Sequence, residues 1–182
     1  MNWFIHALII FTLAIHVIPP GINLNVGSNR LQAIIATAIV TMVQISMFGL
    51  GKLTGDSFLH LIGDWGKGVV FFVFFLISVR MAMEAFKIRK GIINLSLDNP
   101  RLMLLTGIAQ GTDAFAVGMM FYYFPKINFQ TSVIALLLLS SFMIMPAIYT
   151  GKTKSSLTFV SFLYMLGSLV LGVSAIYLLF KL

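Results

Sequence analysis

Long apolar runs separated by short polar loops dominate the chain. Six runs approach or exceed the roughly 20 residues that an α-helix needs to cross a bilayer. They lie near 2–22, 31–50, 67–86, 102–124, 130–150 and 157–180. One compact domain is sufficient for 182 residues. The pattern predicts an all-α integral membrane protein with a single transmembrane domain over 1–182 and six transmembrane helices.

The composition supports this fold class and excludes several functions. The chain is 59% hydrophobic and 9% charged, whereas a soluble domain carries about 25% charged residues. It has no cysteine, which excludes disulfides, thiolate metal sites and thiol redox chemistry. Residues 1–18 lack a basic n-region and a convincing cleavage site, so we interpret them as a retained span rather than a signal peptide. We expect the lipid bilayer as a partner and no nucleic acid.

The first apolar run is interrupted by "HVIPPG" at 16–21. Prolines cannot donate backbone hydrogen bonds, so the helix should kink or end there. Broken helices at membrane depth are tolerated only against protein or a wet cavity. His16 lies in this break and has two interpretations: it binds a transition metal, or it caps the broken helix end.

Basic residues in the loops predict the orientation. The loops after the first, third and fifth spans hold seven: Arg30, Lys87, Arg89, Lys90, Arg101, Lys152 and Lys154. The other side holds four, Lys52, Lys67, Lys126 and Lys181, with Asp56 and Asp64 offsetting two of them. Because cytoplasmic loops are enriched in lysine and arginine, both termini are expected outside the cytoplasm.

Six spans indicate two three-helix repeats, over 1–90 and 91–182. Because each repeat has an odd number of spans, the two repeats would be inverted relative to each other in the membrane. Polar residues at i, i+4 and i+7 form one face in each of two spans. They are Thr37, Thr41 and Gln44 in the second span and Thr106, Gln110 and Asp113 in the fourth. These faces either surround a shared polar interior or hold helices together.

Asp113, within "GTDAFAVG" (111–118), is the acid nearest the middle of the membrane. A carboxylate there costs roughly 2.5–3.5 kcal/mol on insertion scales. Gly107 and Gly111 allow close helix approach, and Thr112 adds a hydroxyl. Asp113 can therefore carry a proton or bind a hard cation, or it can be a protonated acid in an interhelical hydrogen bond.

Arg80 and Glu84 form the second charged feature within the apolar runs. Their i, i+4 spacing places them on one helical face, near the cytoplasmic end of the third span. We interpret them as a structural ion pair.

Several motifs together resemble the MntP-type manganese efflux pumps, a family within the wider group of lysine-exporter-like transporters. They are "GTDAFAVG" (111–118), "LGSLVLG" (166–172), "GLGKLTG" (49–55) and "DWGKGVVFFVFFLISVRMAMEAF" (64–86). The resemblance runs along most of the chain in order. It implies six spans in two three-helix repeats, located in the bacterial plasma or inner membrane.

The resemblance also implies an activity, the export of manganese(II) from the cytoplasm, driven by membrane potential or protons. Asp113 matches the motif aspartate of the second repeat, and Arg80 and Glu84 match the pair in the third span. Manganese is then the transported substrate, and no cofactor is expected.

The chain departs from the family pattern at three positions. The aspartate motif of the first repeat is replaced by "HVIPPGINLNVG" (16–27), with His16 near the missing acid. Gln44 stands where a glutamate is typical, and Tyr164 falls where a family member has an acid. A dehydrated divalent cation usually requires two compensating carboxylates, so we predict a divergent member.

The resulting hypothesis is a transporter that works by alternating access. Its metal ligands are Asp113, His16 and Gln44, and its path is lined by Thr106, Gln110, Thr112 and Thr41. Three alternatives stay open: export of another small substrate, a non-transporting membrane subunit, and an intramembrane enzyme. The enzyme is disfavoured because paired acids are absent and Ser140 or Ser141 has no supporting spacing to His16. A homo-oligomer is compatible with the sequence.

Overall fold

The computed structural model describes residues 3–24, 30–93, 99–124 and 127–181. Regular structure in these ranges is helical throughout. The α-helices are α1 (Trp3–Ile15), α2 (Ile18–Asn23), α3 (Arg30–Phe58), α4 (Gly66–Arg89), α5 (Pro100–Met120), α6 (Phe129–Thr150) and α7 (Lys154–Lys181). Three short 3-10 turns, η1 (Leu59–Leu61), η2 (Gly63–Trp65) and η3 (Phe121–Tyr123), follow α3 and α5.

Six helical segments are long and apolar enough to cross a membrane, which confirms the predicted number of spans. The largest difference from the predicted bounds is in the second span, where helix and η1 continue to Leu61. The exterior is apolar: Phe142, Leu169 and Val173, for example, are more than half exposed. Such a surface requires lipid as its solvent, and the protein is a multi-pass membrane protein.

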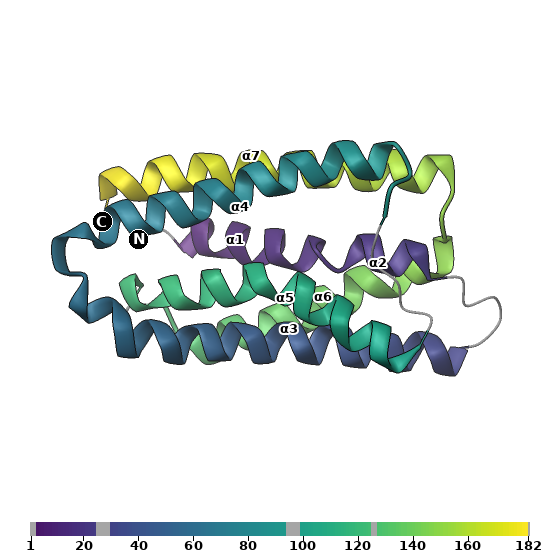
Figure 1. Cartoon of the computed structure of the whole chain (residues 1–182), viewed down its shortest axis with the longest axis horizontal. Coiled ribbons are helices and arrows are strands. Elements are labelled where there is room, and N and C mark those ends of the chain that lie inside the picture. The colour runs from purple at the N-terminus through teal and green to yellow at the C-terminus, as the bar shows by residue number, and fades with distance from the viewer. Residues whose placement is uncertain (1–2, 25–29, 94–98, 125–126, 182) are drawn as a thin grey trace.

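The helices run lengthwise in one bundle, with the first span inside it (Figure 1). In this view α4 and α7 lie along one side, α3, α5 and α6 lie along the other, and α1 and α2 pass between them. The most extensive pairings are α3 with α5 and α4 with α7. Because α1 and α2 pack against α6 and α7, the first span is the most buried of the six.

The first span breaks at the predicted place, because α1 ends at Ile15 and α2 begins at Ile18. In a continuous helix, the carbonyl of His16 would accept a hydrogen bond from the N–H of residue 20. Residue 20 is a proline and has no N–H. The hydroxyl of Tyr164, on α7, donates to this carbonyl instead, at 3.1 Å.

Glycines let the backbones of α3 and α5 touch. A Cβ atom added to Gly51 would lie 2.1 Å from the carbonyl oxygen of Phe115, and one added to Gly118 would lie 2.2 Å from that of Phe48. No side chain fits in either place. This packing sets the depth and rotation of α5, the helix that carries Asp113.

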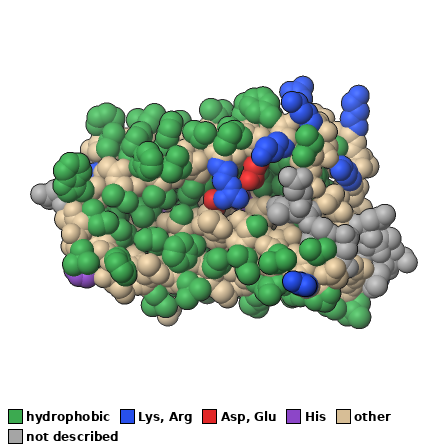
Figure 2. Space-filling model, in the orientation of Figure 1, with side chains coloured by type: hydrophobic (Ala, Val, Ile, Leu, Met, Phe, Trp, Pro, Cys, Tyr) green, Lys and Arg blue, Asp and Glu red, His purple; other side chains and the backbone are tan. Residues whose placement is uncertain are grey.

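Lysines and arginines gather toward the end of the molecule opposite the N-terminus (Figure 2). This end holds the last turn of α4, with Lys87 and Arg89, and the first turns of α5 and α7. At the other end, Lys52 pairs with Asp56 on the surface of α3. The inverted relation between residues 1–90 and 91–182, and the side on which the termini lie, stay predictions.

Candidate functional site

The break in the first span places an imidazole against the buried acid of α5. His16 Nε2 lies 3.0 Å from Asp113 Oδ2, and the two side chains are 1% and 6% exposed. The distance is that of an ion pair. Residues 97 positions apart therefore form one polar centre in an apolar bundle.

The contact of the other ring nitrogen fixes the position of one hydrogen on this imidazole. His16 Nδ1 lies 3.0 Å from the carbonyl oxygen of Thr12. Because a carbonyl only accepts, Nδ1 must carry its hydrogen. In the neutral ring, Nε2 then presents a lone pair to the carboxylate of Asp113. Two acceptors at 3.0 Å need a positive charge between them, either a proton or a metal ion.

This arrangement is typical of metal-binding histidines. Such histidines usually donate their second N–H to a carbonyl or carboxylate, which sets the tautomer and the ring orientation. Adjacent ligands of an octahedral ion with bonds of about 2.1 Å lie roughly 3 Å apart. The distance between His16 Nε2 and Asp113 Oδ2 fits two neighbouring positions on one ion.

Asp113 has a second cationic partner from the opposite side of the bundle. Arg80 Nη1, on α4, donates to Asp113 Oδ1 at 2.9 Å. The same guanidinium donates through Nε to Glu84 Oε1 at 3.1 Å. The i, i+4 spacing predicts the contact with Glu84, but the contact with Asp113 depends on how α4 and α5 face each other.

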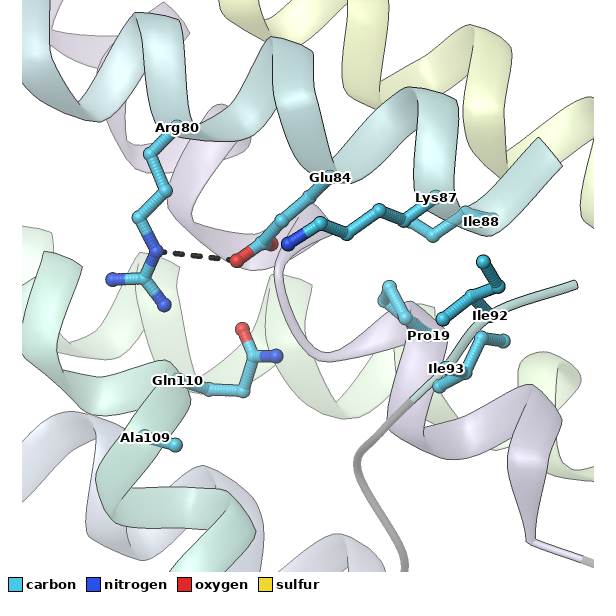
Figure 3. Close-up of a pocket in the computed structure, with 9 residues that line it drawn as sticks. All are labelled: Pro19, Arg80, Glu84, Lys87, Ile88, Ile92, Ile93, Ala109 and Gln110. Carbon is cyan, nitrogen blue, oxygen red and sulfur yellow. Dashed lines mark hydrogen bonds and ion pairs between the residues drawn. The ribbon is translucent and has the colours of Figure 1, made fainter. Parts of the chain in front are cut away.

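A cavity of about 150 Å³ lies beside this ion pair. In Figure 3, Arg80, Glu84 and Lys87 project into it from α4, and Gln110 reaches it from α5. Ile92 and Ile93, which follow the last turn of α4, also line this cavity. The cavity therefore leads from the basic end of the bundle to the guanidinium of Arg80.

A network of hydrogen bonds holds the broken helix next to Asp113. Gln44 Nε2, on α3, donates to the carbonyl of Leu13 at 2.8 Å. Its Oε1 accepts from the hydroxyl of Ser140, on α6, at 2.7 Å. Gln44 is fully buried and links three spans. In the described structure its amide serves this network and makes no contact with Asp113, so its role as a metal ligand stays a prediction.

The four residues expected to line a path occupy different places. Thr41 and Thr106 are buried, and the Thr41 hydroxyl donates to the carbonyl of Thr37. Gln110 lines the cavity, and its buried Oε1 has no hydrogen-bond partner among the described residues. Thr112 is exposed, and its hydroxyl donates to the carbonyl of Ile108. The structure thus brings Gln110, and not Thr112, to the site.

Sequence reasoning did not assign Tyr164 and Ser140 to the site. The signal that could have identified Tyr164 is "HVIPPG", since two prolines free the carbonyls one turn before them. Buried donors from other spans must satisfy such carbonyls. Tyr164 does so at the carbonyl of His16, whereas Ser140 orients Gln44, which donates to the carbonyl of Leu13 at the end of α1.

The ligand set is small. Among the described residues there is no group of three or more His, Cys, Asp or Glu side chains that could hold a metal ion. An ion bound by Asp113 and His16 alone would need further ligands to complete its coordination. A transported ion needs such a site, because it must be able to leave as well as bind.

Comparison with known proteins identifies the family. The family Mntp, described as "Putative manganese efflux pump", matches residues 27–179. No curated protein and no solved structure matches the chain. The match begins after the broken span, the segment in which the sequence departs from the family pattern. The resemblance seen in the sequence is thereby confirmed, and the chain belongs to the Mntp family of putative manganese efflux pumps.

Proposed function

We propose that the protein exports a divalent cation, manganese(II), from the cytoplasm, and that Asp113 and His16 are its ligands in the membrane. One observation carries this proposal. His16 Nε2 and the carboxylate of Asp113 lie 3.0 Å apart, the spacing of two ligands of one ion. Carboxylate oxygens and imidazole nitrogens are ligands that manganese accepts.

The charges near the site suit a cation that arrives hydrated. Asp113 and Glu84 are acidic, and both lie within 3.1 Å of Arg80. Gln110 Oε1 faces the same cavity as an unused carbonyl acceptor. A divalent ion can exchange some waters for these oxygens before it reaches Asp113, which lowers the cost of entering the bundle.

The cavity supports a direction of transport. It opens beside Lys87, at the basic end of the bundle, which the positive-inside rule assigns to the cytoplasm. Access from the cytoplasm is one feature of an inward-facing state of an alternating-access transporter.

The test is manganese tolerance of cells that express the wild type, Asp113→Asn or Asp56→Asn. Asp56 is the matched control, because it is a surface acid paired with Lys52. We expect Asp113→Asn to abolish the tolerance and Asp56→Asn to keep it, at equal membrane expression. Equal export by Asp113→Asn and wild type would refute the proposal. Tolerance without manganese efflux would favour another substrate or a non-transporting subunit.

A further inference from the structure

We propose that Arg80 is a tethered cation that holds Asp113, so that a substrate ion must displace it. Displacement of a guanidinium would select divalent over monovalent ions. This inference rests on the proposed role of Asp113 as a cation ligand. It adds a residue that controls specificity to a site whose ligands are Asp113 and His16.

Both oxygens of Asp113 already have partners. Oδ1 accepts from Arg80 Nη1 at 2.9 Å, and Oδ2 lies 3.0 Å from His16 Nε2. An ion bound to Oδ2 and to His16 Nε2 cannot gain the full charge of the carboxylate while a guanidinium holds the other oxygen. Binding of substrate and contact with Arg80 therefore compete.

Arg80 also stands between the cavity and the acid. It lines the cavity with Glu84 and Gln110, whereas Asp113 does not. The side chain of Arg80 is 37% exposed and that of Asp113 is 6% exposed. An ion that enters through the cavity meets the guanidinium first. Since α4 and α5 make few other contacts, this ion pair is also a main link between these two helices.

The structure offers Arg80 a second place to bind. Its Nε already donates to Glu84 Oε1 at 3.1 Å. A guanidinium has five N–H donors in a rigid fork, so it can keep Glu84 while it releases Asp113. Gln110 lines the same cavity, and its buried Oε1, which has no hydrogen-bond partner among the described residues, can accept from the released Nη1. Displacement then leaves no buried cation without a partner.

Charge explains the selectivity. A potassium or sodium ion that replaces Arg80 at Asp113 exchanges one positive charge for another and loses a charge-assisted hydrogen bond. A divalent ion brings twice the charge to the same carboxylate, and Coulomb attraction scales with that charge. Only a divalent ion gains enough to displace the guanidinium.

The test is manganese binding to the purified full-length chain, measured from the EPR signal of free Mn²⁺ in potassium or choline chloride at equal ionic strength. Wild type should bind equally in both salts. Arg80→Gln should bind about tenfold or more tightly in choline, since a charge-assisted competitor is lost, and should lose most of that gain in potassium. The control Arg89→Gln, which removes a charge from the same helix away from the cavity, should match wild type.

Weaker binding by Arg80→Gln than by wild type, or equal binding without sensitivity to potassium, would overturn the proposal. If Arg80→Gln does not purify as a monodisperse protein, the same binding measurement on Arg80→Lys tests the proposal. Lysine keeps the charge but lacks the fork, so it should bind manganese a few-fold more tightly and stay insensitive to potassium. Unchanged or weaker binding would again overturn the proposal. The proposed function fails separately, if Asp113→Asn binds manganese as wild type does.

Discussion

The hydroxyl of Tyr164 offers a direct test of how the broken span is held. It donates to the carbonyl of His16, and both residues are fully or almost fully buried. Tyr164→Phe removes this donor and keeps the aromatic ring, whose centroid lies 5.6 Å from that of the His16 imidazole. The variant leaves a carbonyl without a partner beside the site, because Pro20 cannot donate to it.

Two magnitudes compete in this prediction. A buried acceptor left without a donor costs about 1–3 kcal/mol in soluble proteins. Interhelical hydrogen bonds in membranes average about 0.6 kcal/mol, with a maximum near 1.7, because the unfolded state in the membrane also finds partners. The carbonyl of His16 cannot pair with the N–H of residue 20 in the folded or in the unfolded state, because residue 20 is a proline. We therefore expect a loss of about 1–1.5 kcal/mol, toward the upper end of the membrane range.

The assay is the free energy of unfolding in mixed micelles, titrated with a denaturing detergent. Tyr177→Phe is the matched control, since it removes a hydroxyl from the same helix about 20 Å away. A double-mutant cycle with Pro20→Ala isolates the cause. Alanine at residue 20 supplies the missing N–H, so Tyr164→Phe should cost less than about 0.5 kcal/mol in that background.

An equal cost of Tyr164→Phe with proline and with alanine at residue 20 would refute the reasoning. It would mean that the hydroxyl stabilises the bundle by a route other than the carbonyl freed by the proline. A cost below that of Tyr177→Phe in the wild-type background would have the same meaning.

Other predictions address packing, the amide network and topology. Gly51→Ala should destabilise the protein by roughly 1–3 kcal/mol or more, because its Cβ would meet the backbone of α5. Gly49→Ala, with nothing within 4 Å of its Cβ, should be neutral or stabilising by up to about 1 kcal/mol; the same detergent titration measures both. Ser140→Ala should cost about 1 kcal/mol, because the buried oxygen of Gln44 loses its donor; an unchanged free energy of unfolding would contradict this. The chain has no cysteine, so an impermeant maleimide should label Lys67→Cys in intact cells and Lys154→Cys only after lysis. The reverse pattern would invert the proposed topology.

The spans and the break could be predicted because they follow from local chemistry. Apolar length defines each span, and two adjacent prolines interrupt a helix whatever surrounds it. The i, i+4, i+7 spacing also identified buried faces, since Thr37, Gln44 and Asp113 are all buried. Thr112 was expected at the site because it is next to Asp113 in the sequence. Neighbouring residues on a helix are rotated by about 100° from each other, and the side chain of Thr112 is exposed.

The contacts within the site could not be predicted in the same way. The meeting of His16 and Asp113 depends on how α2 leaves the break and how α5 packs against α3. The second contact of Arg80 depends on the relative position of α4 and α5. Both contacts depend on how the helices pack against one another, which the periodicity of a single helix does not predict. Gln44 illustrates this point, since its spacing indicates a buried amide and only the structure shows which carbonyl it serves.

Pulsed EPR of manganese bound to the purified protein tests the central claim most directly. If one ion sits between the imidazole and the carboxylate, the spectrum should contain a single ¹⁴N coupling. That coupling should vanish in His16→Gln, and Asp113→Asn should lose the bound ion altogether. Bound manganese without a nitrogen coupling, or with a coupling that survives His16→Gln, would contradict the account.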